Sequence, residues 1–112
     1  MSSNYITLED FSKLDIRIGK VLKAEQIPGS RKLIRLEVDI GGEVRQLVAG
    51  IGDRYRPDEL VGKKVVVLTN IQPKRIFGVL SQGMLLAADV DGKPYLLTVD
   101  TPDEVPVGAK VR

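Results

Sequence analysis

The chain has 112 residues, a formal net charge of +2, and neither cysteine nor histidine. This length suits one domain, residues 1–112, which can bury a sufficient core without disulfides or a structural metal. The missing cysteines exclude disulfides and thiolate metal sites, and the missing histidines remove the commonest general base. Because the net charge is small, binding of a polyanion would require the cations to be concentrated on one face.

In chain order, the sequence predicts a short helix, three strands, a helical turn and at least two further strands. The ranges are 11–13 for the helix, 16–22, 34–40 and 44–49 for the first strands, 55–62 for the turn, and 65–68, 84–88 and 95–99 for the later strands. Five strands with a helix between the third and fourth is the layout of an OB-fold barrel. We therefore predict an all-β fold, a five-stranded OB-fold barrel with short helices and a C-terminal extension.

Local signals support these elements. A capping box begins at Thr7, ahead of the first helix. Gly19 interrupts the apolar alternation of the first strand, which predicts a bulge or a sharp bend there. Apolar and charged residues alternate over 34–40, as in a half-buried antiparallel strand, and a Gly-Gly pair then predicts a tight turn. Residues 65–68 are apolar in succession, so we expect both faces of that strand to be covered.

Two groups of cations stand out. Residues 70–83 contain a proline, two glycines and the adjacent pair Lys74 and Arg75, a composition that favours a surface segment at the mouth of a barrel. Lys32 lies in the loop before strand 34–40, and Arg35 lies on the outer phase of that strand. In an OB-fold these groups would converge over the outer face of the second and third strands, where nucleic acids usually bind. The alternative is scattered solubilising charge.

Motifs for catalysis or metal binding are incomplete. The Gly50 segment resembles a dinucleotide loop without its third glycine, and Asp89 with Asp91 resembles a calcium loop without its other ligands. A strand end and a hairpin turn explain these residues better. Ser81 has no sequence context of a nucleophile, and no carboxylate pair is brought into one apolar pocket. We predict a binding module that is not an enzyme and uses no cofactor.

The aromatic content of 4% leaves few residues that could stack on bases. Phe77, inside the basic 70–83 segment, is the best candidate. This composition favours recognition of the shape and backbone of a folded RNA over binding of a long single strand. No apolar run approaches the ~20 residues that a membrane span needs, so we expect a cytoplasmic protein without a membrane partner.

Several segments together form a more specific pattern. They are 14–21, Pro28 with Lys32-Leu33, 47–51, 60–63, and 70–88 with its Ser81-Gln82-Gly83-Met84 quartet. This pattern resembles the tRNA-binding domain family, found appended to methionyl-tRNA synthetases and as stand-alone tRNA-binding proteins. The resemblance runs from Phe11 to Arg112 and implies an OB-fold, a homodimer and sequence-tolerant tRNA binding. Because the chain begins with its own methionine and the resemblance spans almost its whole length, we expect a stand-alone β subunit of methionyl-tRNA synthetase, and an appended domain of that enzyme is the alternative. Aminoacylation would reside in a separate catalytic chain.

The cation groups and the resemblance together predict an RNA-binding site. Its residues are Lys32, Arg35, Asn70, Lys74, Arg75, Ser81, Gln82 and Met84. The cations would neutralise phosphates, the three polar side chains would hydrogen-bond sugars, phosphates or base edges, and Met84 would add an apolar contact. The alternative function is a chaperone-like or protein-interaction module on the same barrel, with an exposed apolar groove around Phe77, Leu80 and Met84.

Overall fold

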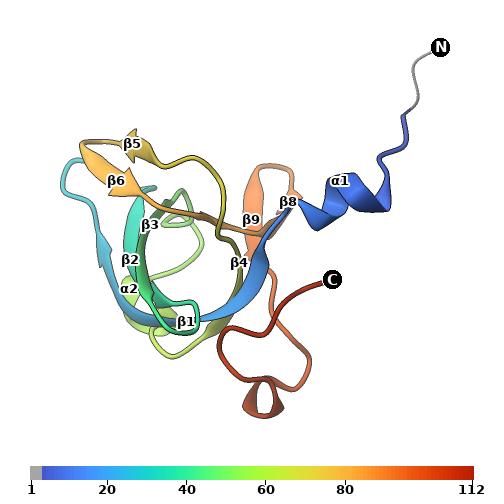
Figure 1. Cartoon of the computed structure of the whole chain (residues 1–112). Helices are drawn as coiled ribbons and strands as arrows, with labels where there is room; N and C mark the ends of the chain where they lie inside the picture. The colour runs from blue at the N-terminus through green and yellow to red at the C-terminus, as the bar shows by residue number, and fades with distance from the viewer. Residues whose placement is uncertain (1–3) are drawn as a thin grey trace.

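The computed structural model describes residues 4–112. The strands are β1 (Ile16–Gln26), β2 (Ile34–Asp39), β3 (Val44–Ala49), β4 (Lys64–Leu68), β5 (Lys74–Ile76), β6 (Val79–Ser81), β7 (Met84–Leu85), β8 (Ala87–Val90) and β9 (Lys93–Leu96). The helical turns are α1 (Leu8–Ser12), α2 (Pro57–Leu60) and the 3-10 turn η1 (Pro102–Glu104). Five strands form one antiparallel sheet in the order β3-β2-β1-β4-β7, and the hairpins β5-β6 and β8-β9 lie outside it (Figure 1). No helix within residues 4–112 is long and apolar enough to cross a membrane.

The sheet curls into a nearly closed barrel because the end of β6 and the residue after it hydrogen-bond to the free edge of β3. The Gln82 amide donates to the Gln46 carbonyl at 2.8 Å. The Val48 amide donates to the Ser81 hydroxyl at 3.0 Å. These bonds replace part of a strand ladder across the closing seam. The predicted all-β OB-fold barrel, with α2 between the third and fourth strands of the barrel, is confirmed.

The barrel interior is aliphatic. On β2 the inward residues Ile34, Leu36 and Val38 are almost fully buried, while the residues between them are only partly covered, as the alternation predicted. The core cluster consists of Val21, Ile34, Leu36, Val38, Ile40, Leu47, Ile51, Leu60, Val65 and Val67. Each such side chain contributes about 1.5–3 kcal/mol when it leaves water, so this cluster dominates the stability of the barrel.

A second apolar cluster lies on the outside of β1 and β4, where the C-terminal tail covers it. It is built around Ile16, Ile18 and Val66. The Ile18 amide donates to the Ala109 carbonyl at 2.9 Å, and the Ile18 carbonyl accepts from the Gly108 amide at 2.7 Å. The tail therefore pairs with the first half of β1, beyond the point where β2 leaves it. This packing confirms that both faces of β4 are covered.

Of the two alternatives predicted at Gly19, a bulge or a sharp bend, the bulge does not lie at that residue. The register of β1 against β2 shifts between Val21 and Lys23 instead. Gly19 has a different role, because a Cβ there would lie 2.6 Å from Val38 Cγ1 and 3.1 Å from the Asp39 carbonyl oxygen. Glycine is required here because any side chain would collide with the Val38 side chain and the β2 backbone.

The single strand predicted over 84–88 is divided at Leu86. Residues before it pair with β4, and residues after it pair with β9. The Leu86 amide donates to the Val66 carbonyl at 2.9 Å, whereas its carbonyl accepts from Leu97 at 3.1 Å, so the chain changes partner at this residue. The last predicted strand consequently ends at Leu96 instead of continuing to residue 99.

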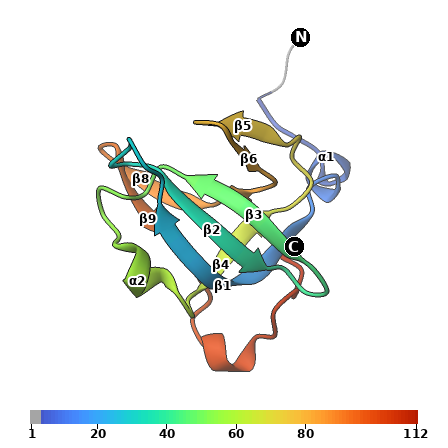
Figure 2. The same cartoon turned by 90° about the vertical axis from the view of Figure 1, so that its left-hand side faces the viewer.

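Two further elements differ in extent from the sequence predictions. The capping box of Thr7 and Asp10 is present, but α1 follows it directly and therefore begins at Leu8. The connecting segment 70–83 contains the hairpin β5-β6, whose turn residues Phe77 and Gly78 have φ angles of 55° and 81°. Two consecutive positive φ angles match the twist of a two-residue hairpin turn. This hairpin and η1 lie at opposite ends of the molecule (Figure 2).

Candidate nucleic-acid interface

The loop at 27–33 and the β5-β6 hairpin meet at one end of the barrel. A Cβ on Gly29 would lie 3.4 Å from Phe77 Cε2, so the loop contacts the turn of the hairpin. The loop is braced by a bond from the Ile27 amide to the Leu33 carbonyl at 3.1 Å and by one from the Leu33 amide to the Ser30 hydroxyl at 3.1 Å. The two segments that carry the predicted cations therefore come together.

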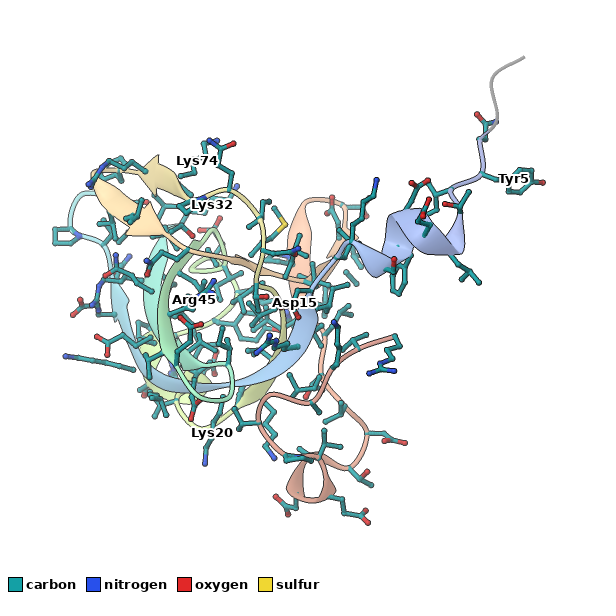
Figure 3. All side chains as sticks on the ribbon, in the orientation of Figure 1. Tyr5, Asp15, Lys20, Lys32, Arg45 and Lys74 are labelled. Carbon is teal, nitrogen blue, oxygen red and sulfur yellow. The ribbon has the colours of Figure 1, made fainter. Side chains whose placement is uncertain are left out.

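Lys32 and Lys74 border two adjoining hollows at this end. The hollow lined by Lys74 and the hollow lined by Lys32 share Gly50, Ala87 and Pro94. Both lysines lie at the upper end of the barrel in Figure 3, whereas Lys20 lies at the opposite end. The β8-β9 hairpin, which sequence reasoning did not connect with the site, supplies Ala87 and Pro94; no local pattern marked them.

Four cations at this end are exposed and, within residues 4–112, form no ion pair. They are Arg31, Lys32, Lys74 and Arg75. The only hydrogen bond of the Arg75 guanidinium in that range is a long one, 3.4 Å to the Gly78 carbonyl. Asp89 also borders the Lys32 hollow, but its carboxylate accepts a bond from the Gly92 amide at 2.8 Å and caps the β8-β9 turn. This end of the barrel thus carries an excess of positive charge, and its four cations are available to a ligand.

Arg35 lies apart from this group and is engaged by carboxylates. Its guanidinium pairs with Glu25 at 3.1 Å and with Glu37 at 2.9 Å. A third bond, at 2.7 Å, goes to the Gln46 side chain on β3. The outer face of β2, where we expected the two cation groups to converge, therefore carries two acids around one arginine. The free positive charge lies at the barrel mouth instead.

The side chains of Asn70 and Ser81 are engaged in hydrogen bonds within the protein itself. Asn70 Oδ1 accepts from the Asp15 amide at 2.8 Å, and its Nδ2 donates to the Lys13 carbonyl at 2.7 Å. Ser81 is buried, and its hydroxyl accepts from Val48 at 3.0 Å and donates to the Gly83 carbonyl at 3.2 Å. Both side chains hold the ends of the 70–83 segment in place.

Gln82 and Met84 remain closer to the surface. Gln82 Oε1 accepts from the Gln46 amide at 3.3 Å, which contributes to the closing seam of the barrel. Met84 is 47% exposed and lines the same hollow as Lys74. Of the predicted residues, the structure brings Lys32, Lys74, Arg75 and Met84 to this end of the barrel with exposed side chains.

Arg45 has a structural role that the sequence did not reveal. Its Nη1 donates to the Thr69 carbonyl at 2.8 Å and to the Gln82 carbonyl at 3.1 Å, so it ties β3 to both sides of the 70–81 segment. Arg45 also hydrogen-bonds Glu43 and lowers the pKa of that carboxyl. On β1, the hydrogen bonds from the Arg17 side chain likewise lower the pKa of Asp15.

Comparison with known proteins agrees with this geometry. A family model described as "Putative tRNA binding domain" matches residues 16–110. Methionine--tRNA ligase of Thermotoga maritima is 57% identical over 108 residues, which are 96% of this chain and 17% of that protein. The corresponding enzyme of Archaeoglobus fulgidus is 57% identical over 106 residues, 95% of this chain and 16% of that protein. The chain thus spans about a sixth of the length of these curated relatives.

Solved structures extend the comparison to short proteins. A MetRS-related protein from Pyrococcus horikoshii has a TM-score of 0.91 and 46% identity, covering 98% of this chain and 100% of that chain. The chaperone CsaA of Bacillus anthracis has a TM-score of 0.86 and 37% identity, covering 96% and 99%. The chain belongs to the tRNA-binding domain family.

Proposed function

We propose that this chain binds tRNA through the cationic end of its barrel, as an accessory domain or β subunit of a methionyl-tRNA synthetase in the cytoplasm. The observation that carries the proposal is a group of four cations that form no ion pair with any residue of 4–112, at one end of a barrel of the tRNA-binding family. Its relatives named methionine--tRNA ligase support the link to that enzyme. Aminoacylation belongs to a separate catalytic region.

Binding of this kind is tolerant of sequence. Lysine and arginine side chains contact phosphates, which all tRNAs present in the same folded shape. Phe77 is 60% exposed at the tip of β5-β6, but no row of exposed aromatic side chains accompanies it at this end in the described chain. The surface therefore recognises backbone and shape in preference to a run of stacked bases.

The residues divide into two kinds of role. Lys32, Lys74 and Arg75 contact phosphates. Asn70 and Ser81 act indirectly, because their hydrogen-bonding groups hold the segment on which Lys74 and Arg75 are carried. Such bracing lowers the entropy lost when the segment is ordered by the RNA. Arg35 strengthens the barrel wall and contributes little to binding, since Glu25 and Glu37 already neutralise it.

A comparison of the two ends of the molecule tests the proposal. The double variant Lys32→Ala with Lys74→Ala removes two of the free cations. Lys20→Ala with Lys63→Ala removes the same charge from a hollow at the other end. Affinity for tRNA, measured by filter binding at a fixed salt concentration, should fall more than tenfold for the first pair and less than twofold for the second, because each phosphate contact contributes on the order of 1 kcal/mol. Equal losses for both pairs would place the site elsewhere.

We also propose that the chain forms a homodimer through its N-terminal segment and C-terminal tail. Ile6 is 69% and Leu8 88% exposed, which is unusual for apolar side chains on one short segment. A hollow of about 360 Å³, lined by residues of α1 and the tail such as Phe11 and Val111, adjoins them. Light scattering should give twice the mass of one chain for the parent protein. The Leu8→Glu variant should have the mass of one chain.

A chaperone-like role is the second candidate, and two observations favour it. The chain is similar in structure to the chaperone CsaA of Bacillus anthracis. In addition, the hollow beside Lys74 is mainly apolar. Competition distinguishes the two functions: an unfolded polypeptide that displaces tRNA, with tighter binding than tRNA itself, would favour the chaperone role.

A further inference from the structure

The hollow beside Lys74 is a built feature of the barrel mouth. It has a volume of about 390 Å³ and lies between the end of β3, the β5-β6 hairpin, β7 and the β8-β9 hairpin. Its apolar walls are Ile51, Ile71, Ile76, Met84, Leu85 and Leu96. None of the described residues that line it is acidic. It is large enough to take a flat heterocycle.

The floor of the hollow is held by the closing seam. Ser81 is bonded to Val48 and Gly83, and all three residues also line the hollow. A Cβ on Gly83 would lie 2.7 Å from Leu47 Cδ2, so the segment after β6 sits directly on the core. The shape is therefore formed before any ligand arrives, which reduces the loss of freedom on binding.

Charge and polarity at the rim indicate what the hollow accepts. Lys74 lies on its edge, and Lys32 borders the adjoining hollow that shares Gly50, Ala87 and Pro94. Gln72 also lines it, and within residues 4–112 its side-chain amide has no hydrogen-bond partner. A primary amide offers both a donor and an acceptor, so it can pair with an edge of any nucleobase.

We propose that this hollow receives one unstacked nucleobase of the bound tRNA, with the phosphates on either side of it at Lys32 and Lys74. The proposal deepens the tRNA-binding function above and rests on it. A nucleobase has apolar faces for the aliphatic walls, a polar edge for Gln72, and an anion at each end of its nucleotide. Loops of folded RNA supply such unstacked bases.

An extended peptide fits the same surface less well. Its backbone amides would enter a hollow whose walls are mainly apolar. Each amide that is buried there without a hydrogen-bond partner makes the free energy of binding less favourable. A neutral peptide would also leave the lysines at the rim without a partner. The combination of apolar walls and a cationic rim therefore favours a nucleotide.

Filling the hollow tests the proposal. Ala87 is exposed and lines the hollow, so Ala87→Phe places a ring in it without changing charge. Val90→Phe is the matched control, since Val90 lies on the same strand, is 51% exposed and lines neither hollow. A second variant, Met84→Ala, removes one wall from a position that is 47% exposed. Thermal unfolding of each variant shows that it folds.

The probe is a tRNA transcript in which 4-thiouridine replaces uridine, and the readouts are affinity, salt dependence and the site of photo-cross-linking. With the parent protein, the cross-link should map to residues of the hollow. Ala87→Phe should lose this cross-link and bind about tenfold more weakly, within the range that loss of one base contact produces. Its salt dependence should be unchanged, because the phosphate contacts remain. Met84→Ala should weaken binding about threefold, and Val90→Phe should behave as the parent.

Failure of this proposal is distinct from failure of tRNA binding. If Ala87→Phe binds and cross-links as the parent does, the base lies elsewhere although tRNA still binds. If Ala87→Phe abolishes binding of an unfolded polypeptide but leaves tRNA binding intact, the occupant is a peptide. If the parent does not bind tRNA, both proposals are overturned.

Discussion

Two arginines, Arg75 and Arg35, are predicted to differ sharply in their contribution to tRNA binding. Arg75 is exposed on β5, and its guanidinium has no carboxylate partner within residues 4–112. Arg35 is paired with Glu25 at 3.1 Å and with Glu37 at 2.9 Å. Replacing either by alanine removes one positive charge from the chain. Only Arg75→Ala should remove a charge that is free to neutralise a phosphate.

The expected magnitude follows from counterion release. Each phosphate contact contributes about 0.7–0.9 to the slope of log K against log salt, so four free cations predict a slope of roughly −2.8 to −3.6 for the parent. Arg75→Ala should reduce the slope by about 0.8, which corresponds to about fivefold weaker binding at 0.15 M salt. Arg35→Ala should leave the slope unchanged and instead destabilise the barrel by about 1 kcal/mol, because two acids lose their common partner.

Fluorescence anisotropy of labelled tRNA, titrated with each protein at several salt concentrations, measures the slopes. Urea unfolding measures the stability of each variant. The reasoning would be refuted if Arg35→Ala reduced the slope as much as Arg75→Ala, because the ion pairs of Arg35 would then not restrain its charge. An unchanged slope for Arg75→Ala would show that the hairpin does not contact the phosphates.

The other predictions concern stability. Ser81→Ala should lower the free energy of unfolding, measured in urea, by about 1–3 kcal/mol, because it leaves the buried Val48 amide without its acceptor. Asn70→Ala should lower it by about 1–2 kcal/mol through the loss of two hydrogen bonds. Gly19→Ala should destabilise the protein by at least about 2 kcal/mol, since the new methyl group meets atoms of β2 at 2.6 and 3.1 Å. The pKa of Asp15 is lowered in the folded state, so its carboxylate stabilises the fold above the ordinary pKa of 3.8 and this contribution is lost as pH falls through the lowered pKa. The free energy of unfolding of Asp15→Asn should therefore fall less steeply at acid pH than that of the parent.

Controls make these outcomes specific. Ser12→Ala removes an exposed hydroxyl that donates to Glu9 at 2.7 Å and should change stability by less than about 0.5 kcal/mol. If Ser81→Ala changed the free energy of unfolding as little as Ser12→Ala, the Ser81 hydroxyl would have no stabilising role in the closing seam. If Asn70→Ala keeps its stability but loses tRNA affinity, Asn70 contacts RNA directly and does not act through Asp15 and Lys13. If the free energy of unfolding fell equally steeply at acid pH for the parent and for Asp15→Asn, the Asp15 carboxyl would not contribute to the pH dependence of stability.

Local sequence determined most of the barrel strands. The alternation over 34–40 placed β2, the glycine pair after it placed the turn to β3, and Pro57 with its acids placed α2. These features depend on neighbours a few residues apart, so periodicity, turn geometry and capping are sufficient to predict them. The resemblance over 70–88 likewise identified the family that the comparisons show.

Tertiary structure decided which residues are available to a ligand. Arg35 and Arg75 are indistinguishable by residue type, yet strand register places Arg35 opposite Glu25 and beside Glu37, whereas Arg75 lies on a hairpin outside the main sheet. Ser81 is a polar residue, yet the closing seam buries it. Lys32 and Lys74 border adjoining hollows that share Gly50, Ala87 and Pro94. A side chain's free charge and hydrogen-bonding capacity depend on contacts between distant segments, and those contacts form only when the barrel closes.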